Sequence, residues 1–132
     1  MQTTGNTILI TGGGTGIGRG LAEALHARGN TVIIAGRRAS VLAEVADRHS
    51  GMRGIECDVS DGTKITGFAT RVVADLPALN VLINCAGIQE NEGMKPVIDE
   101  DLLMRTVAIN LLGPIRLTSA LLPGSAATQT CD

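Results

Sequence analysis

Two kinds of hydrophobic pattern alternate along the chain. Short runs of apolar or β-branched residues are typical of buried strands, and apolar residues at every third or fourth position are typical of amphipathic helices. The short runs predict strands at the start of Thr7–Gly18 and over Thr31–Ala35, Arg53–Cys57 and Val81–Asn84. The helical spacing predicts helices from about Ile17, over Ala39–Arg48, from Ser60 or Asp61 to near Pro77, and from about Glu100 to Leu122.

This alternation predicts the fold class α/β. Helices of this length between strands imply parallel strands joined by right-handed crossovers, so we expect a doubly wound parallel sheet with strand order 3-2-1-4. We expect the domain to cover residues 1–122 and to stop after about four strands, because residues 123–132 form a small, polar tail without the apolar run of a fifth strand. Ligands bind such sheets at the carboxyl ends of the strands, near the point where the order reverses.

Composition narrows the class of protein. Hydrophobic residues make up 44% and charged residues 18% of the 132 residues, and a formal net charge of -2 argues against a dedicated nucleic-acid or membrane binder. The first apolar run is far shorter than the about 20 residues of a membrane span, so we expect a cytoplasmic protein. Cys57, Cys85 and Cys131 show no CxxC spacing, and His26 and His49 lack a metal-ligating neighbour. The cysteines therefore do not predict a disulfide framework, and the cysteines and histidines do not predict a metal site.

The segment Thr7–Gly18, TILITGGGTGIG, passes from a strand through a glycine turn into a helix. Glycine lets a pyrophosphate approach the backbone, and a helix start offers unpaired N–H groups and a partial positive charge. The sequence therefore predicts dinucleotide binding at this turn. The candidate cofactor-binding residues here are Gly12, Gly14, Thr15, Gly16, Ile17 and Gly18. For Thr15 the alternative is a surface turn residue, and we expect the hydroxyl of Thr11 to brace the turn.

Two other nucleotide-binding motifs fit this turn less well. A nucleoside triphosphate P-loop requires Lys and then Ser or Thr after its last glycine, but Gly18 is followed by Arg19 and Gly20. A methyl-donor site usually has an acidic residue after the second strand to hold the ribose hydroxyls, and Arg37 stands there instead.

Arg37 and Arg38 follow the second predicted strand. In NAD sites an acidic residue about 20 residues beyond the glycines binds the ribose hydroxyl, whereas a guanidinium at that place can pair with a 2′-phosphate. The pair therefore favours NADP over NAD. The alternative is that both arginines belong to a solvated turn.

Several segments in this order resemble the classical short-chain dehydrogenases/reductases: TGGGTGIG, GRR, CDVSD, NCAG and a helical Asn110. The resemblance covers residues 5 to 122 and implies a Rossmann-type sheet. It also implies that Asp58 contacts the adenine ring with Val59 beside it. The NCAG turn resembles the family's NNAG turn beside the cofactor, which adds the candidate residues Asn84, Ala86 and Gly87, with Cys85 in place of the second Asn.

Asn110 has two interpretations. By resemblance it is the family's helical Asn, which holds a water in a proton relay and distorts its helix. From the residues alone, a single Asn among apolar neighbours is a locally bonded polar residue. Under either interpretation Pro114 has no N–H for the carbonyl of Asn110, so a freed acceptor and a kink are expected.

The family carries out hydride transfer with a Ser and a Tyr-x-x-x-Lys motif, in which Tyr serves as the acid or base. The 132 residues contain no Tyr and end before these elements. We therefore expect the cofactor-binding half of an NADP-dependent oxidoreductase, inactive alone, that would act on a carbonyl or alcohol substrate only if completed. The alternatives are a noncatalytic dinucleotide-binding module and a non-functional truncated product.

The end of the predicted sheet also suggests self-association. Strand Val81–Asn84 would be an apolar edge, and the helix from Glu100 would expose an apolar face. We therefore expect a homo-oligomer.

Overall fold

The computed structural model describes residues 2–90 and 97–124. Its strands are β1 (Thr7–Thr11), β2 (Thr31–Gly36), β3 (Arg53–Glu56) and β4 (Leu79–Asn84). Its helices are α1 (Gly16–Ala27), α2 (Ala39–Asp47), α3 (Gly62–Asp75), α4 (Glu100–Val107) and α5 (Gly113–Leu121), with a π-helical segment η1 (Ala108–Leu112) and a 3-10 helix η2 (Leu122–Gly124). Most of the predicted polar tail, including Cys131, lies outside the described residues.

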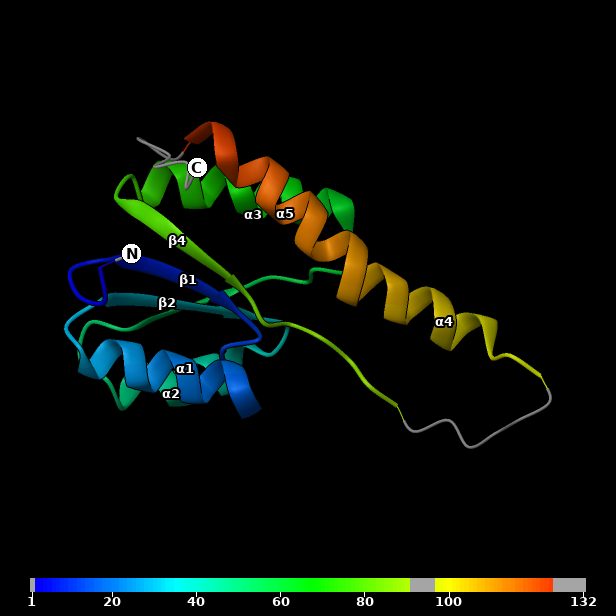
Figure 1. Ribbon diagram of the computed structural model, residues 1–132, viewed down its shortest axis with the longest axis horizontal. Coiled ribbons are helices and arrows are strands. Elements are labelled where there is room, and N and C mark those ends of the chain that lie inside the picture. The colour runs from blue at the N-terminus through cyan, green and yellow to red at the C-terminus, as the bar shows by residue number, and fades with distance from the viewer. Residues whose placement is uncertain (1, 91–96, 125–132) are drawn as a thin grey trace.

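The strands form one parallel sheet in the order β3-β2-β1-β4, which confirms the predicted order 3-2-1-4. Helices α1 and α2 cover one face of this sheet, and α3 and α5 cover the other (Figure 1). The chain thus has the three layers of a Rossmann-type fold, in which the strand order reverses between β1 and β4.

The two inner strands supply the centre of the core. Ile8, Ile10, Val32 and Ile34 pack toward α1 and α2, whereas Leu9 and Ile33 pack toward α3 and α5. Successive strand residues point to opposite faces, so a strand covered on both faces must be apolar throughout. This is why these strands are continuous apolar runs in the sequence.

A network of asparagines ties the amino ends of the strands together. The Oδ1 atom of Asn30 accepts from the backbone N–H of Asn6 at 3.0 Å and from its side-chain amide at 3.1 Å. Asn80 donates to Asn6 Oδ1 at 3.0 Å and accepts from the N–H of Thr7 at 3.0 Å. These bonds lie at the edge of the sheet opposite to the carboxyl ends, so they fix the strands without entering the site described below.

The predicted single helix from Glu100 to Leu122 is interrupted. The N–H of Gly113 donates to the carbonyl of Ala108, five residues earlier, within the π-helical segment η1. Pro114 lies in the first turn of α5 and cannot donate to the carbonyl of Asn110, so an α-helical bond is missing here. The helix is thus irregular where Pro114 predicts it, in the form of a π-helical turn, and the expected kink stays a prediction.

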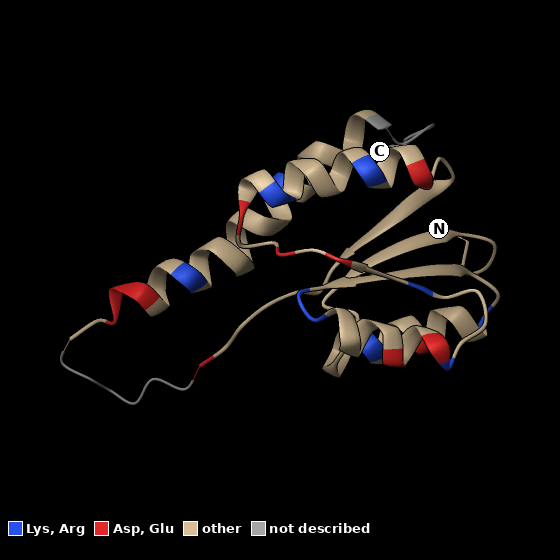
Figure 2. Cartoon of the chain, turned by 180° about the vertical axis from the view of Figure 1, so that it is seen from behind, with Lys and Arg blue, Asp and Glu red and all other residues tan. Residues whose placement is uncertain are grey.

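Charged residues of both signs are interspersed over the helices (Figure 2). Within the described ranges, no helix combines the length and the apolar character needed to cross a membrane.

Candidate functional site

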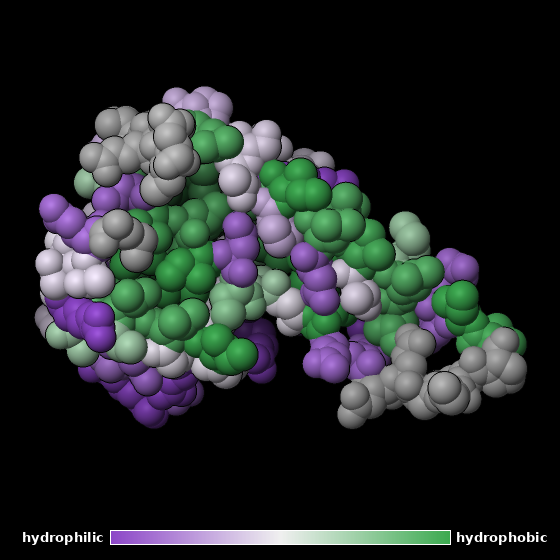
Figure 3. Space-filling model, viewed as in Figure 1, coloured by the Kyte–Doolittle hydropathy of each residue, from purple (hydrophilic) through white to green (hydrophobic). Residues whose placement is uncertain are grey.

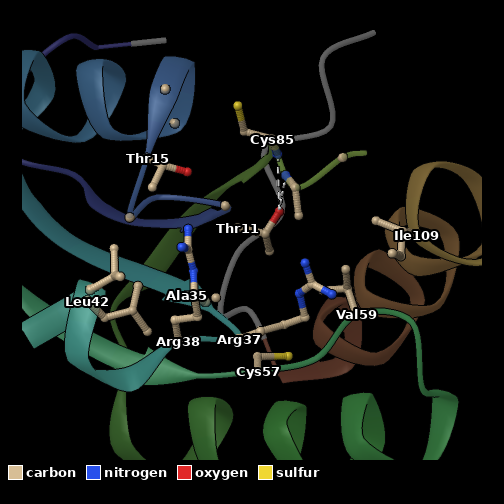
Figure 4. A pocket seen from close by; sticks show the side chains of 18 of the residues that line it. Thr11, Thr15, Ala35, Arg37, Arg38, Leu42, Cys57, Val59, Cys85 and Ile109 are labelled. Atoms are coloured by element: carbon tan, nitrogen blue, oxygen red, sulfur yellow. Dashed lines mark hydrogen bonds between the residues drawn. The ribbon is translucent and has the colours of Figure 1, made fainter. Parts of the chain in front are cut away.

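A cavity of about 340 Å³ lies at the carboxyl ends of the strands (Figure 4). Its walls come from the segments that follow β1, β2, β3 and β4, together with Ile109 of η1. These segments are far apart in the sequence, and the parallel sheet brings them to one edge. The cavity contains these predicted cofactor-binding residues: Gly12, Gly14, Thr15, Gly16, Ile17, Gly18, Arg37, Arg38, Asp58, Val59, Ala86 and Gly87.

The glycine turn is bound to the neighbouring strand. The N–H groups of Gly12 and Gly13 donate to the carbonyl of Ala35 at 2.8 Å and 3.3 Å. Gly12 has φ 68°, and a Cβ at this position would lie 2.8 Å from the Cα of Ala86. The turn after β1 therefore packs directly on the turn after β4, and a side chain at Gly12 would separate them.

Helix α1 begins against this turn, and its first residues, Gly16, Ile17 and Gly18, line the cavity. A Cβ on Gly18 would lie 2.2 Å from the carbonyl oxygen of Gly12, so the absence of a side chain permits the contact. Thr15 is the N-cap residue, but its side chain makes no capping bond, and the first turn has no acidic residue. Neither the N-cap side chain nor a first-turn carboxylate therefore compensates the partial positive charge of the helix start, which suits an anion site.

Thr11, at the end of β1, lines the cavity and holds a different turn from the one expected. We expected its hydroxyl to brace the glycine turn. Instead, Thr11 Oγ1 accepts from the N–H groups of Cys85 and Ala86, both at 3.1 Å, and thereby holds the NCAG turn (Figure 4). Its side chain is buried. The sequence signal for this role was a polar residue at the end of an apolar strand, but its partners are 74 and 75 residues away.

Arg37 and Arg38 extend from the end of β2 into the region of the cavity (Figure 4). The carbonyl of Arg38 also accepts from Val41 and Leu42 and so starts α2. In the described part of the chain neither guanidinium lies within ion-pair distance of a carboxylate. Both cations are therefore available to an anionic group in the cavity.

Asp58 is held by its neighbours in the segment after β3. Its Oδ1 accepts from the N–H of Ser60 at 3.0 Å and from the Ser60 hydroxyl at 2.6 Å, and its Oδ2 lies 3.8 Å from Lys64 Nζ. The hydrogen bond from the Ser60 side chain is the main reason that the pKa of Asp58 lies below its ordinary value, and the charges of Lys64 and Arg37 contribute to it. Asp58 is thus an ionised acceptor at the cavity wall.

Two cysteines line the cavity with different surroundings. Cys57 is buried, and burial raises the pKa of its thiol to about 11. Cys85 is partly exposed, and both thiols are free. Cys57 is therefore a protonated, apolar part of the wall at neutral pH.

Asn84, at the end of β4, is next to the cavity but does not line it. Its side-chain amide donates to the hydroxyl of Thr118 on α5 at 3.2 Å. The contact connects the end of β4 to the helix that covers the sheet.

Asn110 lies in η1 and holds the segment that follows the NCAG turn. Its Oδ1 accepts from the N–H of Ile88 at 2.9 Å, and its Nδ2 donates to the carbonyl of Ile88 at 2.8 Å. Asn110 lines a second, more open groove, which shares Gly87 and Ile88 with the cavity. These bonds are not local, because Ile88 lies 22 residues away, so the locally bonded interpretation does not describe this side chain. The part of Asn110 in a proton relay stays a prediction.

The sheet topology and the glycine turn define a Rossmann-type α/β protein, and the comparisons with known proteins give its family. The family model for short chain dehydrogenases matches residues 6–129. The chain belongs to the short-chain dehydrogenase family.

Named relatives agree with this assignment. The uncharacterized oxidoreductase DltE of Bacillus subtilis is 36% identical over 124 residues, which are 93% of this chain and 49% of DltE. The uncharacterized oxidoreductase Rv1543 of Mycobacterium tuberculosis is 33% identical over 128 residues, which are 91% of this chain and 38% of that protein. The chain thus spans half or less of the length of these relatives.

Solved structures also place the chain among the short-chain dehydrogenases. A short-chain dehydrogenase from Streptomyces avermitilis superposes with a TM-score of 0.81 at 34% identity, covering 93% of this chain and 45% of that one. The Pseudomonas aeruginosa RhlG/NADP complex superposes with a TM-score of 0.86 at 25% identity, covering 96% of this chain and 51% of that one.

Proposed function

We propose that this chain is the cofactor-binding part of an NADP-dependent oxidoreductase of the short-chain dehydrogenase family. The observation that carries the proposal is the position of Arg37 and Arg38 on the same cavity as the glycine turn. The glycine turn suits the pyrophosphate. The guanidinium groups of Arg37 and Arg38, at the end of the neighbouring strand, suit a further phosphate group. NADP differs from NAD by the 2′-phosphate on its adenosine ribose, which is separate from the pyrophosphate.

The residues present fit a dinucleotide. The contacts of Gly12 and Gly18 leave no room for side chains, and the open start of α1 can receive the pyrophosphate. Asp58 and Val59 would hold the adenine ring, and Ala86 and Gly87 would border the nicotinamide end. When bound, the nicotinamide supplies the hydride that is exchanged with a carbonyl or alcohol substrate.

The choice of NADP over NAD is tested by exchanging the arginines. The variant Arg37→Ala/Arg38→Ala should bind NADPH at least tenfold more weakly, because each charge-assisted bond to a phosphate is worth roughly 1.5–3 kcal/mol. Its affinity for NADH should change little. The measurement is the dissociation constant for each dinucleotide, determined by calorimetry. Arg71→Ala on α3 is the control, because Arg71 is exposed and does not line the cavity.

Equal losses for NADPH and NADH would contradict the assignment of the arginines to the 2′-phosphate. A chain that binds neither dinucleotide would contradict the proposed function itself.

We propose that these 132 residues bind cofactor without turning over a carbonyl substrate. They contain no Tyr, so a tyrosine acid would have to come from outside them. Asn110 would then serve as a relay position only in a completed enzyme. We expect the chain to bind NADPH without oxidising it in the presence of carbonyl compounds. NADPH oxidation at a specific rate that does not fall on further purification, and so does not come from a contaminating enzyme, would contradict this. The noncatalytic dinucleotide-binding module is the second candidate, favoured by the same missing Tyr.

We place the chain in the cytoplasm, because the free thiols Cys57 and Cys85 suit a reducing compartment.

A further inference from the structure

Two adjacent residues, Ser60 and Asp61, are both suited to cap helix α3, and only one of them does so. Asp61 is the N-cap residue, and its Oδ1 accepts from the N–H groups of Thr63 and Lys64 at 2.9 Å and 3.2 Å. The Ser60 hydroxyl therefore does not cap α3. The hydroxyl binds Asp58 instead, beside the bond from the Ser60 N–H that forms an Asx turn.

Ser60 fixes one oxygen of the Asp58 carboxylate with two donors. Both the N–H and the hydroxyl of Ser60 bind Oδ1, at 3.0 Å and 2.6 Å, so the two bonds determine the orientation of the carboxylate. Among the described residues, the one ion pair of Oδ2 is the 3.8 Å contact with Lys64, whose side chain is exposed. The carboxylate thus has one oxygen used within the chain and one able to accept from a ligand.

We propose that Ser60 is a positioning residue that orients Asp58 so that Oδ2 accepts from the amino group of adenine, and that it thereby selects an amino-bearing purine. The inference rests on the proposed dinucleotide site. An ionised carboxylate only accepts hydrogen bonds, so it favours a base with an amino donor over a base with a carbonyl oxygen at the same position. A freely rotating carboxylate would discriminate less.

The experiment compares the dissociation constants of NADPH and of its hypoxanthine analogue, in which a carbonyl replaces the adenine amino group. We expect the native chain to prefer NADPH and Ser60→Ala to lose about tenfold of this preference, the scale of one hydrogen bond to a charged group. Ser60→Thr keeps the hydroxyl and should keep the preference. Asp61→Ala is the control, because it removes the cap of α3 and lowers stability while the preference stays unchanged.

A second measurement needs no ligand. The side-chain carboxyl of Asp58 is titrated by NMR in the native chain and in Ser60→Ala, with Lys64, Arg37 and Cys57 as the titratable groups that face it. Loss of the hydroxyl donor should raise the pKa of Asp58, because the donor stabilises the charged form. The loss of NADPH affinity on acidification should then begin at a higher pH in Ser60→Ala than in the native chain.

An unchanged base preference in Ser60→Ala, or an equal loss in Asp61→Ala, would overturn the inference while leaving NADPH binding intact. An unchanged Asp58 pKa in Ser60→Ala would also overturn it. Failure of the native chain to bind any dinucleotide would overturn the proposed function first, so the two failures are distinguishable.

Discussion

The glycines near the cavity serve different purposes at neighbouring positions. Gly18 faces the carbonyl of Gly12 so closely that no side chain fits, whereas Gly20, two residues later in α1, has open space around it. The spacing of the glycines predicted a phosphate turn. Which glycine is sterically required depends on contacts between the turn and the helix, which the spacing does not contain.

This difference leads to a prediction for α1. Gly18→Ala should lower the free energy of unfolding by about 1–3 kcal/mol, because the new Cβ forces the turn and the helix apart. Gly20→Ala should leave it unchanged or raise it by up to about 1 kcal/mol, because alanine favours a helix interior. Urea unfolding of both variants checks this, and equal effects would contradict the role assigned to Gly18.

At the scale of elements, the segment after β4 is held by a helix side chain. Asn110 binds both backbone groups of Ile88, as a neighbouring strand would, and it does so from the π-helical segment η1. In the sequence, Pro114 predicted the irregularity of the helix. The partner of Asn110 was not predictable, because the two residues are 22 positions apart and meet only in the folded chain.

Hydrogen exchange tests this connection. In Asn110→Leu the amide of Ile88 loses its acceptor, so its exchange should become roughly tenfold faster, the scale of one lost hydrogen bond. Asn110→Asp keeps an acceptor oxygen and should protect the amide better than Asn110→Leu. Equal protection in the native chain and in Asn110→Leu would show that the contact does not hold this segment.

At the scale of the whole molecule, the outer face of the long helix is apolar. Met104, Leu111, Ile115 and Leu122 are 53–62% exposed and recur along α4, η1 and α5 into η2. In the space-filling view a strip of hydrophobic residues follows this helix, with polar residues beside it (Figure 3). Strand β4 is an edge strand of the described sheet, as expected. Exposed apolar surface of this kind promotes association.

We therefore predict that the chain self-associates through this face. The double variant Leu111→Glu/Ile115→Glu should shift the chain toward the monomer in sedimentation velocity, because charges oppose burial of the face. Arg71→Glu is the control, because it changes the net charge by the same amount from an exposed position on α3. A native chain that sediments as a monomer would contradict the prediction.

The sequence alone determined the parallel sheet, its strand order, the glycine turn after β1 and the positions of Arg37, Arg38 and Asp58 at the carboxyl ends of the strands. It did so because these features are local patterns, and the topology of a parallel sheet brings the strand ends to one edge. Only the tertiary structure decided what Thr11, Asn84, Ser60 and Asn110 contact. Ser60 and Asp61 show the reason even at short range: both side chains can cap α3, and the path of the folded chain gives the cap to Asp61 and the Ser60 hydroxyl to Asp58. For Thr11, Asn84 and Asn110 the partners are distant in sequence, so their bonds depend on how the layers pack.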